Sequence, residues 1–168
     1  MPKRLLKHYR YSLMAEKEAR ACPQSRSAYR RFASFATRWR DNDQYGHMNN
    51  AVYYELFDSA VNKFLIENSI LDLAGANTVF LVASSGCNYF DEVAYPSDVE
   101  IGLSLSRLGS SAVTYQLGLF IAGAELTAAT GTFIHVNVDA KTKRPCAIDD
   151  TIRAKFADLI VGGAIDPH

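Results

Sequence analysis

Apolar and polar positions in the middle of the chain alternate with the period of a helix. Two adjacent i, i+4 rows of apolar side chains run through residues 51–68: Val52, Leu56, Ala60 and Phe64, and beside them Phe57, Val61 and Leu65. Two neighbouring rows make a wide apolar stripe, which is typical of a helix that buries one side in a protein core. The pattern therefore predicts one long helix that ends near Asn68.

The pattern changes to strand-like segments after residue 77. Four long strands are predicted within residues 78–93, 98–108, 112–122 and 125–139, and a shorter one within 31–40. In the second long strand Val99, Ile101, Leu103 and Leu105 share one face, and Glu100 and Ser104 share the other. Hairpin signals at 109–111 and 122–124 require antiparallel neighbours. We therefore expect an α+β fold in which an antiparallel sheet wraps around the long helix.

The two ends of the chain are expected to be helical. Leu5, Tyr9 and Leu13 recur at helical spacing, which predicts a helix over residues 4–20 that stops near Pro23. A short helix is predicted over residues 149–160, with Asp149 or Asp150 as its N-cap. Residues 1–31 form a predicted N-terminal extension, and residues 32–168 a single domain.

Charge is unevenly distributed along a chain whose net charge is zero. Residues 1–31 carry nine Lys or Arg and two Glu, so the extension is basic and the remainder is acidic. Such asymmetry suits contact with a nucleic acid or an anionic surface, or docking of a basic helix on an acidic body. We favour the second interpretation.

Composition indicates a globular protein with reduced thiols. Hydrophobic residues make up 48% of the 168 residues, but no run reaches the ~18–20 apolar residues of a membrane span. The three cysteines have no CxxC spacing, which favours a cytoplasmic protein without a zinc site. The basic start of the chain leaves a mitochondrial transit peptide as the alternative, although Glu16 and Glu18 interrupt that character. No nucleotide-binding glycine motif appears, and no cofactor is predicted.

The segment WRDNDQYGHMNN, residues 39–50, is the strongest candidate for a chemical site. Asn49 or Asn50 suits the N-cap of the long helix, and acids before a helix gain from its dipole. These roles do not explain two acids together with Gly46 and His47. A carboxylate opposite unpaired helix-end N–H groups is sufficient for acyl transfer, with the acid as nucleophile or as base toward water.

Other reactive residues are given structural interpretations. Cys87 lies in a strand pattern without an adjacent base, so packing is the favoured role. Residues 84–86, Ser-Ser-Gly, lack the first glycine of a nucleophile elbow. His135 is predicted to be structural or to contact another subunit. The basic cluster Lys141, Lys143 and Arg144 either touches nucleotide phosphates or is a solvated turn.

A resemblance to a known family rests on the same loop. The pattern D-x-D-x-x-G-H-x-N-N-x-x-Y, residues 41–53, resembles the signature of hotdog-fold acyl-CoA thioesterases of the hydroxybenzoyl-CoA thioesterase type. Asp58 stands where that family usually has Glu, and residues 95–98, Tyr-Pro-Ser-Asp, resemble its Pro-x-x-Gly-Asp turn. The resemblance covers residues 32–148 and implies the hotdog fold for the predicted domain.

The resemblance also implies roles for individual residues. Asp43 matches the catalytic acid, and the N–H of Asn50 matches the group that polarises the thioester carbonyl. His47 matches a histidine that is catalytic in plant acyl-carrier-protein thioesterases and only structures the loop in other relatives. We expect Gly46 to allow a positive φ or a close backbone approach. The remaining residues expected to contact substrate are Asn49, Tyr53, Asp58, Lys143 and Arg144.

The implied substrate is an acyl-CoA or an acyl-carrier thioester, and the implied assembly is a homodimer or homotetramer with the substrate channel between subunits. No nucleic acid, metal or membrane span is expected. Two alternatives remain open at this point. One is a non-catalytic hotdog protein that senses acyl-CoA. The other is a hotdog hydratase, whose Asp-x-Asn-x-x-His pattern differs from the residues present here.

Overall fold

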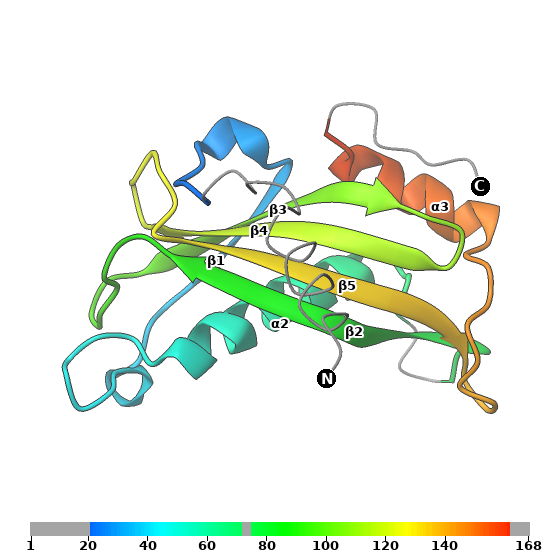
Figure 1. Ribbon diagram of the computed structural model, residues 1–168, viewed down its shortest axis with the longest axis horizontal. Helices are drawn as coiled ribbons and strands as arrows, with labels where there is room; N and C mark the ends of the chain where they lie inside the picture. The colour runs from blue at the N-terminus through cyan, green and yellow to red at the C-terminus, as the bar shows by residue number, and fades with distance from the viewer. Residues whose placement is uncertain (1–20, 72–74, 162–168) are drawn as a thin grey trace, which may run out of the picture.

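The computed structural model describes residues 21–71 and 75–161. In this part of the chain, five antiparallel strands form one sheet, and the long helix α2 (Asn50–Glu67) lies against one face of it (Figure 1). The strands are β1 (Arg31–Phe35), β2 (Thr78–Tyr89), β3 (Val99–Leu108), β4 (Ala112–Ile121) and β5 (Ala129–Asp139). The predicted α+β fold with an antiparallel sheet is confirmed.

The order of strands across the sheet is β1-β3-β4-β5-β2. The two predicted hairpins join β3 to β4 and β4 to β5. The two edges were not predicted: β1 pairs with β3, and β2 pairs with β5 although β2 precedes β3 in the chain. Residues 90–98 therefore carry the chain from one side of the sheet toward the other.

The core lies between α2 and the inner face of the sheet. Phe57, Val61 and Leu65, one of the two predicted rows, are at most 2% exposed. The helix α3 (Asp150–Phe156) closes the core near the end of α2, where Phe156 packs 6.0 Å from Phe64 between ring centroids. Asp149, one of the two residues predicted as the N-cap of α3, has this role, and its side chain accepts a hydrogen bond from the Ile152 N–H. No helix among the described residues has the length and apolar character to span a membrane.

The outer face of β3 and β4 is covered by the segment before β1. Gly102 and Gly118 are direct cross-strand partners, and the ring of Tyr29 lies over both. A Cβ at Gly118 would lie 2.5 Å from the Tyr29 hydroxyl oxygen, so only glycine admits the ring. Burial raises the pKa of Tyr29 to about 12. Because this face is covered, Ser104 is buried although the alternation placed it on a polar face.

The strand predicted over residues 31–40 is shorter than expected. β1 ends at Phe35, and the chain turns into the 3₁₀ helix η2 (Trp39–Asp41). The Asp41 carboxylate accepts a hydrogen bond from the Arg38 N–H at 2.7 Å, which stabilises the turn over a continued strand. The predicted helix over residues 4–20 lies outside the described residues. Residues 23–31, expected as a connector, contain a single 3₁₀ turn, η1 (Arg26–Ala28).

We predict that Gly118→Ala lowers the free energy of unfolding by about 1–3 kcal/mol, because the added methyl group displaces the Tyr29 ring. Urea denaturation followed by circular dichroism measures the change. The control is Gly86→Ala, where a Cβ meets no atom within 4 Å and the effect should stay below about 0.5 kcal/mol. Equal urea midpoints for Gly118→Ala and the wild type would refute the role given to Tyr29.

Candidate active site

The start of α2 is capped from within its own loop. Asn49 is the N-cap: its side-chain Oδ1 accepts from the Ala51 N–H at 2.9 Å, and its carbonyl accepts from the Val52 N–H at 2.9 Å. Within the described residues, the N–H of Asn50 donates no hydrogen bond. The helix therefore offers one uncompensated N–H at its first residue.

The loop before α2 is closed on itself. Asn42 and Met48 form an antiparallel bridge, and the Asp43 N–H donates to the His47 carbonyl at 2.7 Å. The Asn49 N–H donates to the Asp41 carbonyl at 2.8 Å, which ties the loop to the N-cap. Gly46 has a φ of 86°, so the expected positive φ is confirmed. Residues 43–47 therefore project as a tight turn directly at the helix start.

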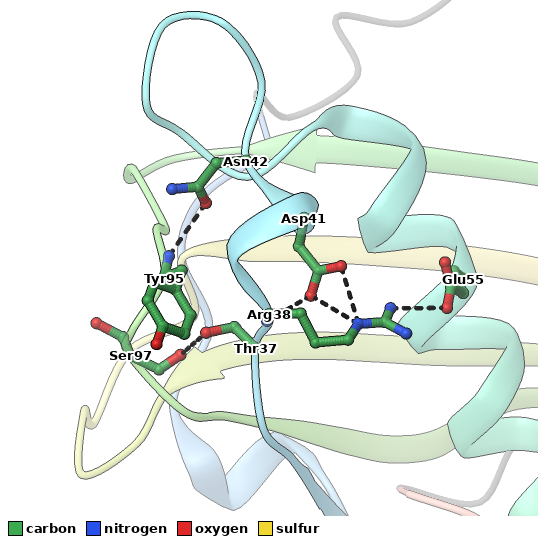
Figure 2. A network of polar contacts seen from close by, with 7 residues as sticks. All are labelled: Thr37, Arg38, Asp41, Asn42, Glu55, Tyr95 and Ser97. Carbon is green, nitrogen blue, oxygen red and sulfur yellow. Dashed lines mark hydrogen bonds and ion pairs between the residues drawn. The ribbon is translucent and has the colours of Figure 1, made fainter.

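Asp41 anchors this loop from a buried position (Figure 2). It is 4% exposed, and both of its carboxylate oxygens accept from Arg38, at 2.7 Å from the N–H and at 3.0 Å from Nε. Arg38 Nη2 also donates to Glu55 Oε1 on α2 at 3.1 Å. The hydrogen bond to Asp41 and, to a smaller extent, the hydrogen bond to Glu55 raise the pKa of the Arg38 guanidinium. We call Arg38, Asp41 and Glu55 the Arg38 clamp.

The connection that follows β2 supports the other side of the loop. Three hydrogen bonds join the two segments. The Tyr95 N–H donates to Asn42 Oδ1 at 3.1 Å, and Thr37 Oγ1 donates to the Ser97 carbonyl at 2.9 Å (Figure 2). The third runs from the Met48 N–H to the Val93 carbonyl at 2.6 Å. The loop is thus held between α2 and residues 93–97.

Asp43 occupies a different environment from Asp41. Its side chain is half-buried, and Oδ1 accepts from the N–H groups of Tyr45 at 2.8 Å and His47 at 3.3 Å. Within the described residues, no hydrogen bond reaches Oδ2. One oxygen therefore orients the carboxylate, and the other has a lone pair to offer to a substrate or a water molecule.

His47 points toward the connection after β2. Its Nε2 lies 3.1 Å from Glu92 Oε2, and the two side chains are 47% and 76% exposed. His47 meets the Asp43 carboxylate through its backbone N–H. This contact structures the loop, and a catalytic role of the imidazole stays a prediction.

Aromatic side chains lie beneath the first turns of α2. Tyr53 is buried, with its ring 5.0 Å from that of Tyr89 on β2 in an edge-on arrangement. Burial raises the pKa of Tyr53 to about 12 and also raises the pKa of the Cys87 thiol. Cys87 is therefore protonated at neutral pH and packs against the core, as its predicted role requires.

Three predicted substrate contacts lie away from the loop within one chain. Asp58 is about 12 Å along α2 from Asn50, and its Oδ2 accepts from Asn62 Nδ2 at 2.9 Å. Lys143 and Arg144 are exposed in the turn after β5. We call residues 42–48 the Asp43 loop. The turn with Lys143 and Arg144 lies at the opposite end of the β2–β5 pair from this loop (Figure 1). The chain alone does not bring these residues together with Asp43.

His135 belongs to the core. It is 2% exposed, and its ring centroid lies 5.0 Å from that of Tyr115. Burial lowers the pKa of His135, and Asp58 partly offsets this effect. A structural role, one of its two predicted roles, agrees with this position. Among the described residues, no group of three or more His, Cys, Asp or Glu side chains is arranged to hold a metal ion.

Two residues that position the loop were not singled out from the sequence. The sequence contained a signal for Arg38: Asp41 follows it by three residues, which is the spacing of a capping box at the start of a helical turn. The strand-like pattern of residues 31–40 obscured it. Glu92 carried no such signal, because its contact with His47 depends on how residues far apart in the chain meet.

We predict that Arg38→Met lowers the free energy of unfolding by about 1–3 kcal/mol, because the buried Asp41 carboxylate loses its guanidinium donor. Chemical denaturation gives the value. Glu55→Gln is the matched control: it removes only the exposed arm of the Arg38 clamp, and should cost less than about 1 kcal/mol. Equal losses of unfolding free energy in Arg38→Met and Glu55→Gln would show that the burial of Asp41 does not determine how much the Arg38 clamp contributes to stability.

The fold is similar to that of solved bacterial proteins. PA5185 from Pseudomonas aeruginosa strain PAO1 is 45% identical, with a TM-score of 0.79, over 83% of this chain and 97% of that chain. PA2801 from Pseudomonas aeruginosa is 30% identical, with a TM-score of 0.70, over 77% and 99%. Slr0204, a 1,4-dihydroxy-2-naphthoyl-CoA thioesterase from Synechocystis, is 11% identical, with a TM-score of 0.69, over 76% and 96%; this likeness concerns the fold alone.

A family model supplies the assignment. Residues 37–156 match the model of the Thioesterase-like superfamily. The match begins at the Arg38 clamp, includes the Asp43 loop and α2, and extends to the end of α3. The sheet packed on one long helix is the arrangement that the resemblance implied. The chain therefore belongs to the Thioesterase-like superfamily and has the hotdog fold.

Proposed function

We propose that this protein hydrolyses an acyl-CoA or acyl-carrier thioester to a free acid and a thiol. The observation that carries the proposal is the position of Asp43. Its carboxylate is oriented through one oxygen in a closed turn, and that turn leads directly to the uncompensated N–H of Asn50. Family membership supports the same reaction class.

The Asn50 N–H is suited to the carbonyl oxygen of the substrate. Negative charge develops on that oxygen when the thioester carbon becomes tetrahedral. An unpaired N–H at a helix start, aided by the positive end of the helix dipole, stabilises such charge without reorganisation. Because Asn49 rather than Asn50 serves as the N-cap, the Asn50 N–H remains available for this role.

Asp43 has two chemically balanced routes. As a general base it takes a proton from water, the resulting hydroxide adds to the carbonyl carbon, and the C–S bond breaks to release a thiolate, which takes the proton back from Asp43. As a nucleophile its oxygen adds to the same carbon and expels the thiolate; water then cleaves the mixed anhydride, which restores the Asp43 carboxylate and supplies the proton that the thiolate gains. Both routes end in a carboxylic acid and a thiol.

The free edge of β2 favours a homodimer. β2 pairs with β5 on one side, and the other side has no partner strand among the described residues. Leu81 and Val82 on this strand are 45% and 51% exposed. A long edge strand with exposed apolar side chains is a template for pairing with another chain. We infer that two copies join β2 to β2 about a two-fold axis.

Such a dimer would place Lys143 and Arg144 of one copy near the Asp43 loop of the other. In antiparallel pairing, the Thr78 end of one β2 lies beside the Tyr89 end of the other. The turn with Lys143 and Arg144 lies at the Thr78 end, and the Asp43 loop lies beyond the Tyr89 end. One copy would thus bring two cations to the loop of the other. Their charge suits the phosphate groups of CoA or of a carrier prosthetic arm.

We predict that Asp43→Asn lowers kcat by about 10²–10⁴-fold, because the amide can neither accept the proton nor attack the carbonyl. Its side-chain oxygen still accepts from Tyr45 and His47, so the loop should keep its shape. Thiol release from short-chain, long-chain and aromatic acyl-CoAs measures the rate. The control is Asp150→Asn on α3, which should hydrolyse at the wild-type rate.

Two outcomes would contradict the proposal. Wild-type turnover by the Asp43→Asn variant would remove Asp43 from the chemistry. Saturable acyl-CoA binding by the wild type without thiol release would assign the protein to the non-catalytic binding class instead.

We predict that Val82→Lys yields monomers and lowers hydrolysis at least tenfold, because a lysine ammonium on the edge strand disfavours pairing of two β2 strands. Sedimentation velocity gives the assembly state. Thr132→Lys, an exposed position on the neighbouring strand β5, is the matched control and should remain dimeric. A stable, fully active monomer would overturn the inferred dimer.

A further inference from the structure

Large aromatic side chains are exposed around the Asp43 loop. Trp39 is 78% exposed, Tyr45 75% and Tyr95 42%. They come from η2, from the loop itself and from the connection after β2, so three separate segments present rings beside the loop. A single exposed apolar side chain needs no explanation, but a group of this kind marks a site of interaction. The proposed hydrolysis leaves this group unused.

Trp39 and Tyr95 form a corner of two rings. Their ring centroids are 6.1 Å apart and their planes meet at 87°, so the edge of one ring points at the face of the other. Because Trp39 stays largely exposed in spite of this contact, its indole keeps an open face. A planar ring that stacks on the indole can meet the Tyr95 ring edge-on, and both arrangements are favourable for aromatic pairs. We call these two residues the aromatic corner.

Hydrogen bonds on both sides of Trp39 fix the aromatic corner before a ligand binds (Figure 2). Thr37 Oγ1 donates to the Ser97 carbonyl at 2.9 Å, and the Tyr95 N–H donates to Asn42 Oδ1 at 3.1 Å. The two rings are therefore carried by backbone segments that are tied together at two points. Binding then orders little of the protein, which favours affinity.

The aromatic corner lies next to the groups proposed for hydrolysis. Trp39 is two residues, at most about 7 Å of chain, from Asp41, whose carbonyl accepts from the Asn49 N–H at the start of α2. Asn42, which is bonded to Tyr95, is the first residue of the Asp43 loop. A substrate whose thioester lies at the helix start can thus place a second part at the aromatic corner if a flexible arm joins the two parts.

CoA has a part of this kind. A pantetheine arm joins its thioester to an adenine nucleotide, and adenine is planar, aromatic and uncharged at neutral pH. A hydrocarbon chain has no plane to stack on the indole, and a carrier protein holds the same arm without a base. Among the portions of the two proposed substrate classes, the adenine base therefore matches the aromatic corner best.

Charge around the aromatic corner favours the base over the phosphates of the nucleotide. The connection that carries the phenol ring exposes three acids: Asp91, Glu92 and Asp98. One exposed arginine, Arg40, follows Trp39, and the Arg38 clamp adds one net negative charge. Phosphates are disfavoured in these surroundings, whereas an uncharged base is not. The phosphates would instead meet the cations that the proposed dimer brings to the Asp43 loop.

We propose that the aromatic corner binds the adenine base of CoA, with the base stacked on Trp39 and edge-on to Tyr95. This inference rests on the proposed function for its choice of thioester. It assigns the substrate to the CoA class rather than to the acyl-carrier class, because a carrier arm has no base. Stacking of a base on an aromatic side chain changes affinity by a factor of about ten.

Fluorescence of the full-length protein tests the proposal, because Trp39 is the single tryptophan of the chain. Adenine stacked on an indole quenches its emission. We expect saturable quenching by CoA and by adenosine 3′,5′-bisphosphate, and none by pantetheine, which lacks the base. Tyr95→Ala should weaken CoA binding about tenfold. Ile66→Ala, an exposed apolar residue near the other end of α2, is the matched control and should bind CoA as the wild type does.

Removal of the indole separates binding of the base from the chemistry. Trp39→Ala should weaken CoA binding in titration calorimetry and raise the KM for an acyl-CoA, each about tenfold, with kcat unchanged. Its kcat/KM for the matching acyl-pantetheine should equal the wild-type value. Trp39→Phe keeps a ring and should restore most of the affinity. Because Trp39 is exposed, its loss should leave the urea midpoint unchanged.

Quenching does not depend on hydrolysis, so the two proposals fail separately. Asp43→Asn should be quenched by CoA as the wild type is. A wild-type protein that is quenched by CoA but releases no thiol from acyl-CoAs would keep the adenine site and lose the proposed hydrolysis. A protein that hydrolyses acyl-CoAs without quenching by CoA would lose the adenine site alone.

Four results would overturn the adenine site. They are no saturable quenching by CoA, equal quenching by pantetheine, wild-type affinity of Trp39→Ala for CoA, and a changed sedimentation coefficient of Trp39→Ala. The last result would assign the aromatic corner to contact between copies of the chain.

Discussion

The buried carboxylate of Asp41 is the constraint from which the geometry of the site follows. A carboxylate removed from water must find hydrogen-bond donors, and Arg38 supplies them from its N–H and its guanidinium. Meeting this requirement folds residues 39–41 into a turn and ends the strand pattern early. The Asp41 carbonyl then accepts from the Asn49 N–H, so α2 begins where the Arg38 clamp places it.

The same constraint separates the roles of two acids that stand two residues apart. Both oxygens of Asp41 are engaged by Arg38, which leaves the carboxylate little capacity to accept a proton or to attack a carbonyl. Asp43 uses one oxygen for its own loop and keeps the other. The D-x-D pattern thus combines an acid that fixes the backbone with an acid that remains available for chemistry, and the proposed function depends on this difference.

The sequence predicted what local periodicity determines. The long helix, the hairpins and an asparagine cap at position 49 or 50 follow from patterns within a few residues, and so does the positive φ of Gly46; the structure selects Asn49 as the cap. Pairing of β1 with β3 and of β2 with β5 joins residues 40 to 72 positions apart in the chain, which periodicity does not encode. For the same reason, the signature identified the Asp43 loop but gave no sign that Lys143 lies at the far end of the sheet. The predicted contact of Lys143 with the substrate at the Asp43 loop requires this residue to come from a second copy of the chain.

The packing of α2 decides where the Asp43 loop lies. Phe57, Val61 and Leu65 fix the helix in the core against the sheet. Because close-packed side chains leave a helix little freedom to shift, the Asn50 N–H and the turn that carries Asp43 keep their places relative to each other. The turn with Lys143 and Arg144 lies at the far end of the β2–β5 pair, so these cations reach the loop only if they come from a second copy of the chain, as the proposed dimer requires.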